Sequence, residues 1–238
     1  MTAPRLLHCG DTAISVDFGN VIDLDVNAGV QALDAALAAN PFPGVIETVP
    51  TYRALMVHFD PATCRIEALS AHLLKLRAGL DISQRTPRRW RVPVAYGGEH
   101  GEDLTDMAVF CGLSIAQIVE THAAPVYTVM MIGFLPGFSY LGGLDARLAR
   151  PRRDVPRARI PASSISIGGA QTAIGSVEGP SGWHLIGRTP ALPFLPRRDP
   201  VFLFDAGDEI CFHPISDREW HDLAGRSADG AAVVERLA

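Results

Sequence analysis

VMMIGFLPGFSYLGGLD, residues 129–145, is the stretch that decides the fold of the second half of this chain. It belongs to an uncharged run, Val126–Leu144, that is long enough to raise the question of a membrane span. Four glycines and Pro136 lie within the last twelve residues of the run and would break a helix there. The run therefore predicts a buried strand, Val126–Ile132, that leads into a tight turn, and it argues against a membrane partner.

The residues around this stretch predict a β-rich domain. From Val126 to Ile215, short apolar segments alternate with glycine and proline, and no long helical pattern interrupts them. This texture is typical of an all-β barrel or sandwich. The segment AGDEICFHPI, residues 206–215, predicts a turn followed by a closing strand, and residues 217–238 predict a helix plus a loose end.

The first third of the chain has a different pattern, in which strands and helices alternate. Apolar residues with period two predict strands, and those with helical spacing predict helices. The order is βαββαβ, with strands at 13–18, 45–49, 54–59 and 90–94 and helices at 26–39 and 64–80. This order is that of the ferredoxin-like split arrangement. Residues 103–111 predict a further short helix, and Ser114 to Gln117 form a capping-box pattern that opens another.

The predicted fold class is therefore α+β, with two domains and a tail. A ferredoxin-like α+β domain occupies residues 1–85, a β-barrel domain occupies residues 90–216, and residues 217–238 form the C-terminal tail. The polar, arginine-bearing segment Ser83–Arg89 is the predicted linker.

Composition and charge exclude several functional classes. The 238-residue chain has a net charge of −5, which argues against a nucleic-acid partner. Its four cysteines are far apart and form no C-x-x-C pair, so neither a disulfide framework nor a zinc site is predicted. No bound metal is expected. Reduced thiols and an N-terminus without the long apolar run of a signal peptide indicate a cytoplasmic protein.

Three loop segments, 133–143, 157–172 and 179–190, carry the candidate site residues, and the histidine-bearing segment 120–127 is a fourth candidate. In the first, three residues allow close backbone approach and fixed turns, namely Gly133, Pro136 and Gly137. Phe134, Phe138 and Tyr140 could form the wall of an apolar pocket. The alternative is a packed turn whose aromatic side chains belong to the core.

The second segment begins in an arginine-rich run, which consists of Arg147, Arg150, Arg152, Arg153, Arg157 and Arg159. Only Asp145 and Asp154 oppose these charges nearby in the sequence, so the run suits an anionic ligand or an acidic partner. The alternative is a solvated loop. Backbone amides near glycines can cradle an oxyanion, and the polar residues that follow are Ser163, Gly169, Gln171 and Thr172. The segment lacks the pattern of a nucleotide-binding P-loop.

The third segment, GPSGWHLIGRTP at residues 179–190, combines a flexible turn with Trp183, His184, Arg188 and Thr189. A histidine can transfer protons near neutral pH, and an arginine can hold a carboxylate. The alternative for His184 is a structural role on a strand. The chain contains no G-x-S-x-G, so a serine-hydrolase mechanism has no support.

Seven blocks of the sequence resemble one known family, and they occur in order over about 205 residues. The longest are PVAYGGEHGEDL (93–104), MIGFLPGFSYLGGLD (131–145), RIPASSISIGGAQTAI (159–174) and GWHLIGRTP (182–190); the others are GDTAISVDFG (10–19), VPTYRALMVHFDP (49–61) and AGDEICFHPI (206–215). These blocks are similar to those of the family of 5-oxoprolinase B subunits, also called allophanate hydrolase subunit 1 or KipI-like. The resemblance implies a small N-terminal α+β domain and a C-terminal cyclophilin-like β-barrel.

The same resemblance implies a function within a multi-subunit enzyme. Members act with an allophanate hydrolase subunit 2-like partner, the C subunit, and in ATP-dependent 5-oxoprolinase also with a LamB/YcsF-like partner, the A subunit. That enzyme opens the lactam of 5-oxoproline to give glutamate and uses ATP with Mg²⁺. The chain is expected to be inactive alone. One member inhibits a histidine kinase instead, and related enzymes carboxylate urea, so a regulatory inhibitor and a carboxylation subunit remain alternatives.

On this basis the site residues receive expected roles. His184, Arg188 and Gln171 are the predicted catalytic residues. The predicted substrate-binding residues are Gly133, Phe134, Pro136, Gly137, Phe138, Tyr140, Arg159, Ser163, Gly169, Thr172, Trp183 and Thr189. Three segments depart from the family pattern, at residues 173–176, 180–183 and 191–200, and they leave the identity of the substrate open.

Overall fold

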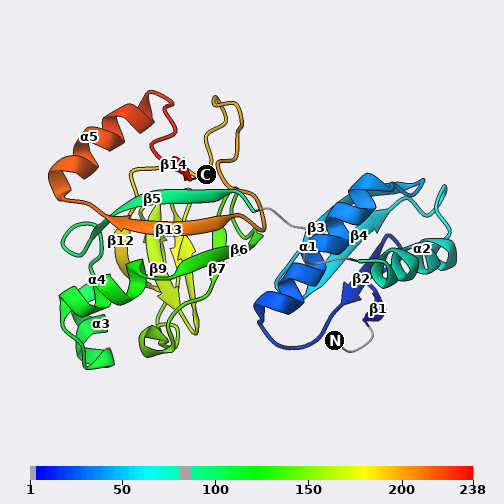
Figure 1. The fold of residues 1–238 in the computed structure, drawn as a ribbon, viewed down its shortest axis with the longest axis horizontal. Coiled ribbons are helices and arrows are strands. Elements are labelled where there is room, and N and C mark those ends of the chain that lie inside the picture. Colours follow the sequence, from blue (N-terminus) through cyan, green and yellow to red (C-terminus); the bar gives the residue numbers. More distant parts are fainter. Residues whose placement is uncertain (1–3, 81–86, 238) are drawn as a thin grey trace. The chain divides into compact units, whose positions relative to one another are not determined.

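The computed structural model describes residues 4–80 and 87–237, which belong to two compact units, 1–86 and 87–238 (Figure 1). The predicted end of the first domain, at residue 85, and most of the predicted linker lie outside the described residues. No single helix within the described ranges has the length and apolarity of a membrane span. Two consecutive helices, Leu104–Cys111 and Ile115–Ala123, meet these criteria only when taken together across a bend of 93°.

The N-terminal unit is a four-stranded antiparallel sheet with two helices. Its elements are β1 (Arg5–His8), β2 (Ala13–Asp17), α1 (Leu24–Ala39), β3 (Val45–Pro50), β4 (Ala54–Phe59) and α2 (Ile66–Ala78). The strands lie in the order β1-β2-β4-β3. Apolar side chains of the two central strands and both helices form one core, which includes Ile14, Val57, Leu33 and Leu69. Asp23 caps α1 by accepting hydrogen bonds from the amides of Asp25 and Val26.

The ferredoxin-like order is not what the structure shows. The predicted fourth strand, Trp90–Val94, is part of β5 (Arg89–Tyr96), and β5 belongs to the C-terminal unit. The edge position beside β2 is taken instead by β1, a strand that the sequence pattern did not predict. A tight turn with Gly10 at a φ of 66° joins β1 to β2. Closing such a short loop costs little entropy, whereas Val92 and Val94 gain full burial in the barrel core.

The C-terminal unit contains a closed seven-stranded barrel, which confirms the predicted β-barrel. Its strands follow the order β12-β9-β10-β7-β6-β13-β5, and the pairing of β5 with β12 closes the ring. Most hydrogen-bonded neighbours are antiparallel, but β5 and β13 are parallel. The remaining elements and the barrel strands have these bounds: α3 (Leu104–Cys111), α4 (Ile115–Ala123), β6 (Val126–Ile132), β7 (Ser139–Gly142), η2 (Ala146–Leu148), β8 (Arg157–Ile160), β9 (Ser164–Gly168), β10 (Gln171–Ile174), β11 (Gly179–Ser181), β12 (His184–Arg188), β13 (Glu209–Pro214), α5 (Asp217–Ala228) and β14 (Glu235–Leu237).

The uncharged stretch Val126–Leu144 contains barrel strand β6, the turn after it and strand β7. Strand β6 pairs with β7 on one side and β13 on the other, and Tyr127 and Val129 are fully buried in the barrel core. The turn after β6 brings Gly137, at a φ of 75°, against the loop at Phe194. A Cβ atom on Gly137 would lie 2.9 Å from the Cβ of Phe194, so only glycine fits there. The apolar run thus serves the barrel core and a tightly packed turn.

The end of the chain is not loose, which corrects the expectation for the tail. After α5, strand β14 pairs antiparallel with β5 and extends the barrel sheet by one strand (Figure 1). Val233 packs into the barrel core and is 8% exposed. One buried valine and a three-residue strand are too short to give a recognisable pattern in the sequence, so the strand was not predicted. Helix α5 itself begins as predicted, with a capping box between Ser216 and Glu219.

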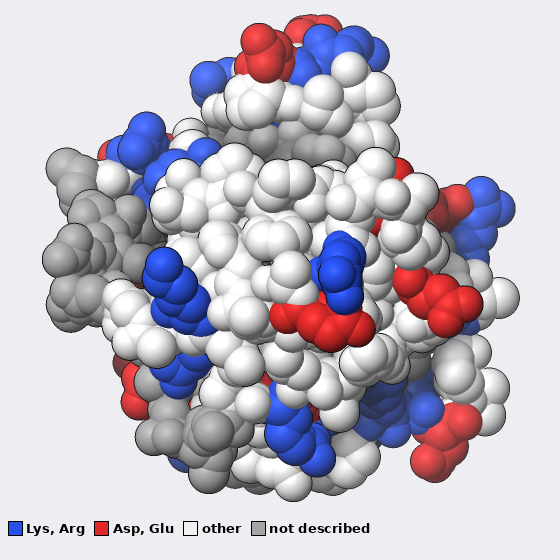
Figure 2. Space-filling view, turned by 90° about the vertical axis from the view of Figure 1, so that its right-hand side faces the viewer, with Lys and Arg blue, Asp and Glu red and all other residues white. Residues whose placement is uncertain are grey.

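The charged side chains do not gather into one basic patch on the face that Figure 2 shows. Basic and acidic groups are interspersed there, and wide uncharged areas separate them. Several arginines of the C-terminal unit form ion pairs with carboxylates.

Candidate functional site

A pocket of about 220 Å³ lies on the outer face of the barrel, where several aromatic side chains meet. Phe134, Phe138, Tyr140 and Trp183 line it, together with Arg152, Arg153, Pro156 and the turn Pro180–Gly182. A small apolar cluster of Phe138, Ala173 and Trp183 lies beside it and is separate from the interior core of the barrel. The segments 133–143 and 179–190, both predicted as site loops, thus come together here.

The aromatic rings hold one another through edge contacts. The ring centres of Phe138 and Trp183 are 6.4 Å apart with planes at 86°, and those of Tyr140 and Trp183 are 5.9 Å apart at 68°. Such T-shaped pairs are the favoured arrangement of aromatic quadrupoles. Phe134 meets Phe138 edge-on at 5.7 Å and remains 62% exposed. Its φ of 71° is rare for a bulky residue, and the surrounding turn maintains this conformation.

Arg152 supplies the positive charge of the pocket. Its guanidinium carbon lies 5.6 Å from the centre of the Trp183 ring, a cation–π contact. Each of the five other arginines of the run forms an ion pair with a carboxylate, and Arg152 alone forms none with the described residues. Burial raises the pKa of the Tyr140 hydroxyl, although the charge of Arg152 opposes this, so Tyr140 stays protonated at neutral pH.

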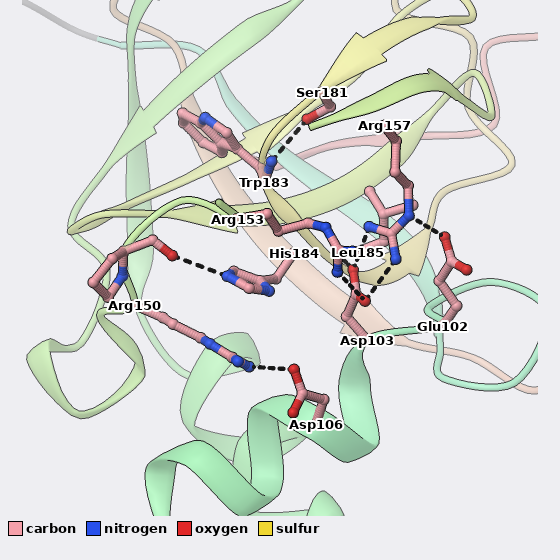
Figure 3. Close-up of polar contacts among 11 residues, drawn as sticks. Glu102, Asp103, Asp106, Arg150, Arg153, Arg157, Ser181, Trp183, His184 and Leu185 are labelled. Atoms are coloured by element: carbon pink, nitrogen blue, oxygen red, sulfur yellow. Dashed lines mark hydrogen bonds and ion pairs between the residues drawn. The ribbon is translucent and has the colours of Figure 1, made fainter. Parts of the chain in front are cut away.

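Asp103 organises the polar side of the pocket (Figure 3). This nearly buried carboxylate accepts two hydrogen bonds of 2.8 Å from Arg157, one of 3.3 Å from Arg153 and one of 2.7 Å from the backbone amide of Leu185. Burial raises the pKa of Asp103, but the hydrogen bonds from Arg157 and Leu185 outweigh it, and the net pKa is lowered. Asp103 therefore ties the start of α3 to the arginine-rich loop and to β12.

Asp103 could not be predicted as part of the site from nearby charges, because its arginine partners lie 50 and 54 residues further along the chain. The true partners are distant in sequence: Asp103 for Arg153 and Arg157, Glu102 for Arg157, and Asp106 for Arg150. The pattern GEDLTD at residues 101–106, which spans the start of α3 and contains three acidic residues, was the available signal. Because the other arginines of the run are paired with carboxylates, Arg152 is the arginine that remains for the predicted anion site.

His184 lies beside the pocket and not in its lining. Its Nε2 atom is 2.9 Å from the carbonyl oxygen of Pro151. A carbonyl only accepts, so Nε2 carries the proton and Nδ1 holds a lone pair. Nδ1 is buried and has no hydrogen-bond partner among the described residues. Burial lowers the pKa of His184, which keeps the ring neutral. The side chain is thus a buried proton acceptor one residue from Trp183.

Gln171 lies on the same face of the sheet as the aromatic cluster. Strand side chains alternate, and Ala173, two residues further along β10, packs against the Trp183 cluster. Gln171 pairs in register with Gly168, and its side chain is only 8% exposed. Its Nε2 atom has no hydrogen-bond partner within residues 4–80 and 87–237. Gln171 therefore presents an unused donor close to the Trp183 wall.

Arg188 is at the other end of β12, four residues from His184, and does not line the pocket. Its Nε atom donates to the carbonyl of Ala162 at 3.2 Å, and its guanidinium lies 5.1 Å from the ring centre of Trp220 on α5. Burial lowers the pKa of Arg188. The three predicted catalytic residues therefore do not converge on one space.

Several predicted substrate-binding residues have structural roles. Ser163 donates from its hydroxyl to the carbonyl of Ala191 at 2.7 Å, and Thr189 accepts from the amide of Ala191 at 3.1 Å. Thr172 is fully buried and bonds to His122 at 3.0 Å. Arg159 pairs with Glu178 at the surface. These four residues shape turns and strands and do not line the pocket.

The predicted glycines and Pro136 form turns. Gly133 donates its amide to the carbonyl of Phe138 at 3.1 Å, which closes the loop that carries the aromatic residues, and Pro136 is exposed within that loop. Gly169, at a φ of 66°, turns β9 into β10. Within the described parts of the chain, no group of three or more His, Cys, Asp or Glu side chains could hold a metal ion.

The chain is similar to known proteins over most of its length. The sequence profile of the carboxyltransferase domain, subdomain C and D, matches residues 4–204. The 5-oxoprolinase B subunit of Bacillus subtilis is 36% identical over 91% of this chain and 95% of that protein. The protein of the same name from Haemophilus influenzae is 41% identical over 70% of this chain and 75% of its own length.

A solved structure, that of TTHA0988, matches with a TM-score of 0.77 and 33% identity over 86% of this chain. The present chain spans only 40% of the TTHA0988 chain, so the remainder of that protein has no counterpart here. The profile match covers most of the chain, and the relatives exceed 30% identity over most of their length. The chain belongs to the family of 5-oxoprolinase B subunits.

Proposed function

We propose that this chain is the B subunit of a cytoplasmic, ATP-dependent 5-oxoprolinase, which converts 5-oxoproline to glutamate together with two further proteins. The observation that carries the proposal is the 36% identity to a curated 5-oxoprolinase B subunit over nearly the whole of both chains. The partners are a C subunit of the allophanate hydrolase subunit 2 type and an A subunit of the LamB/YcsF type. The chain alone has no activity, because the pocket contains only part of the chemistry that the reaction needs.

The aromatic pocket suits a small ring with one negative charge. 5-oxoproline is a five-membered lactam that carries a carboxylate. Its ring packs against Phe138 and Trp183, and its carboxylate pairs with the guanidinium of Arg152, which is otherwise without an ion-pair partner among the described residues. Arg153 is held by Asp103 and forms the rim. The role of this chain is therefore to bind and orient the lactam.

The proton chemistry of the site is limited to groups close to this pocket. Ring opening adds water to the lactam carbonyl and delivers a proton to the leaving nitrogen. The Tyr140 hydroxyl lines the pocket as a donor, and the neutral His184 ring behind Trp183 holds an unshared lone pair on Nδ1. Gln171 and Arg188 act as positioning residues. Gln171 supports the sheet face that carries the aromatic cluster, and Arg188 supports the contact between β12 and α5.

ATP does not fit the pocket. Its volume of about 220 Å³ is below the 300–1,000 Å³ that is usual for ligand pockets, and the lining offers no glycine-rich phosphate loop. We therefore place ATP and its Mg²⁺ ion elsewhere in the assembled enzyme. ATP would activate the lactam carbonyl, which amide resonance otherwise protects from attack.

The experiment that tests the proposal is an omission assay. The chain is purified with its two partners, and ATP hydrolysis that depends on 5-oxoproline is measured with each of the three proteins left out in turn. Loss of turnover when this chain is missing supports the proposal, and unchanged turnover contradicts it.

A role in carboxylation is the second candidate function, since the matching profile is that of a carboxyltransferase domain. Biotin-dependent carboxylation of urea by the assembled proteins, without any response to 5-oxoproline, would favour that function.

A further inference from the structure

A second pocket, of about 350 Å³, lies on the C-terminal unit between the sheet and its last two elements. Its lining residues come from β5, β13, α5, β14 and the segment before β14. It shares no lining residue with the aromatic pocket. Its lining combines apolar with polar residues. The apolar residues are Pro93, Leu223, Ala232, Val233 and Val234, and the polar or charged residues are Arg91, His213, Arg226 and Glu235. A lining that combines apolar and mainly basic residues suits an amphiphilic ligand.

The polar residues that line this second pocket are mainly hydrogen-bond donors. Arg91 Nη2 lies 3.1 Å from His213 Nδ1. A guanidinium only donates, so Nδ1 accepts and His213 presents its remaining proton on Nε2. Arg91 also approaches Glu235, but at 3.6 Å this contact is a long ion pair, and both side chains are about half exposed or more. Two arginines and one imidazole N–H thus stand against a single carboxylate.

Arg226 is the donor without a partner among the described residues. It lies in the last turn of α5 and lines the pocket. Its side chain forms no hydrogen bond and no ion pair within the described ranges, so its N–H groups are available to a ligand. Its charge also adds to that of Arg91 across the same space. An anion that enters the pocket meets two guanidinium groups that approach from different elements.

We propose that this pocket binds the phosphoryl group of a small organic phosphate. Donors from the sheet, on β5 and β13, and from α5 line the same pocket, and this set of several donors suits the oxygens of a tetrahedral phosphoryl group better than one planar carboxylate. The organic part packs against Leu223, Val233 and Val234. The inference is independent of the proposed 5-oxoprolinase function, because it uses none of the residues that line the aromatic pocket.

Three ligands separate the parts of this proposal when they are titrated calorimetrically into the full chain at fixed ionic strength. Phenyl phosphate has both the phosphoryl group and an apolar group, inorganic phosphate has only the first, and benzoate replaces phosphoryl by carboxylate. The expected order of affinity is phenyl phosphate first, inorganic phosphate second and benzoate last, with at least fivefold between phenyl phosphate and benzoate.

Two arginines of the same helix provide a matched pair of variants. Arg226→Ala is expected to weaken phenyl phosphate binding at least fivefold. Arg218→Ala removes the same charge from an exposed position of α5 outside the pocket and is expected to change it less than twofold. Glu235→Gln removes the opposing carboxylate and is expected to strengthen binding.

Three results would overturn the proposal. One is the absence of saturable binding of phenyl phosphate to the folded chain. Another is an equal loss of affinity in Arg226→Ala and Arg218→Ala, which would reduce the effect to general electrostatics. The third is benzoate binding as tightly as phenyl phosphate, which would assign a carboxylate ligand. A far-ultraviolet circular dichroism spectrum of each variant verifies that it is folded.

Discussion

The indole ring of Trp183 lies directly against the backbone of Gly168. A Cβ atom on Gly168 would be 2.5 Å from Cδ2 of the ring, closer than any real side chain can approach. The absence of a side chain at position 168 therefore allows Trp183 to lie against the sheet and to form a wall of the aromatic pocket. The position of the pocket depends on this contact as much as on the aromatic residues themselves.

Gly168→Ala is expected to displace Trp183 and to destabilise the chain by about 1–3 kcal/mol, since the added methyl group overpacks a rigid region. Urea unfolding measures the stability, and the near-ultraviolet circular dichroism spectrum reports the ring. Gly225→Ala is the matched control. Gly225 lies within α5 with no atom near its Cβ position, so alanine should leave stability unchanged or raise it by up to about 1 kcal/mol. Equal stabilities of the two variants would contradict the proposed packing.

Asp103→Asn is expected to destabilise the C-terminal unit by about 3 kcal/mol, because it leaves Arg157 and Arg153 without their nearly buried carboxylate. The control is Asp106→Asn, which breaks the ion pair of an exposed carboxylate with Arg150 and should cost less than about 1 kcal/mol. Chemical unfolding of both variants gives the comparison. If the two substitutions cost the same, Asp103 does not have the organising role described above.

The stability of the chain should fall as the pH drops below about 6.5, and His122 is a main cause. His122 is fully buried between Tyr96 and Thr172, and burial lowers its pKa from 6.5 to about 3. The unfolded chain therefore binds one more proton than the folded chain between these two values, so stability rises with pH across that range. The contribution of His122 is fully present above pH 6.5, and its loss reaches about 5 kcal/mol near pH 3, where the folded histidine finally titrates.

Urea unfolding at pH 5 and pH 7 tests this linkage. The wild type should lose about 2 kcal/mol from His122 alone at pH 5. His122→Gln, which does not titrate, should lose correspondingly less between the same two pH values. His100 and His184 also have lowered pKa values, so the variant should keep part of the dependence. If His122→Gln showed the same pH dependence of stability as the wild type, protonation of His122 on unfolding would not be a cause of that dependence.

Local sequence patterns were sufficient for most secondary structure and for the barrel. Alternation predicted β2 and β4, the uncharged apolar run predicted β6, and helical spacing predicted α1 and α2 close to their observed bounds. Turn chemistry identified the loop after β6, where glycine and proline leave few conformations. In each of these segments the local preference and the burial in the fold agree, which explains why a single sequence was sufficient.

Long-range competition between strands could not be predicted. The pattern of β5 fits the edge of either sheet, and only the parallel pairing with β13, 120 residues further along, places it in the barrel. The pairing of Asp103 with Arg157, 54 residues away, is of the same kind. The sequence also does not show which partners a strand residue contacts. Arg188 and His184 were therefore predicted to share one site, although their contacts lie at opposite ends of β12.

The most direct test of the central claim is the KM for 5-oxoproline of the assembled enzyme that contains Arg152→Ala, compared with Arg147→Ala. Both substitutions remove one positive charge from the connection between β7 and β8, but Arg147 lies in η2 and is paired with Asp145 outside the pocket. We predict that Arg152→Ala raises KM at least tenfold while Arg147→Ala changes it less than twofold. An unchanged KM in Arg152→Ala, in an enzyme that still hydrolyses ATP in response to 5-oxoproline, would contradict the assignment of the aromatic pocket as the lactam site.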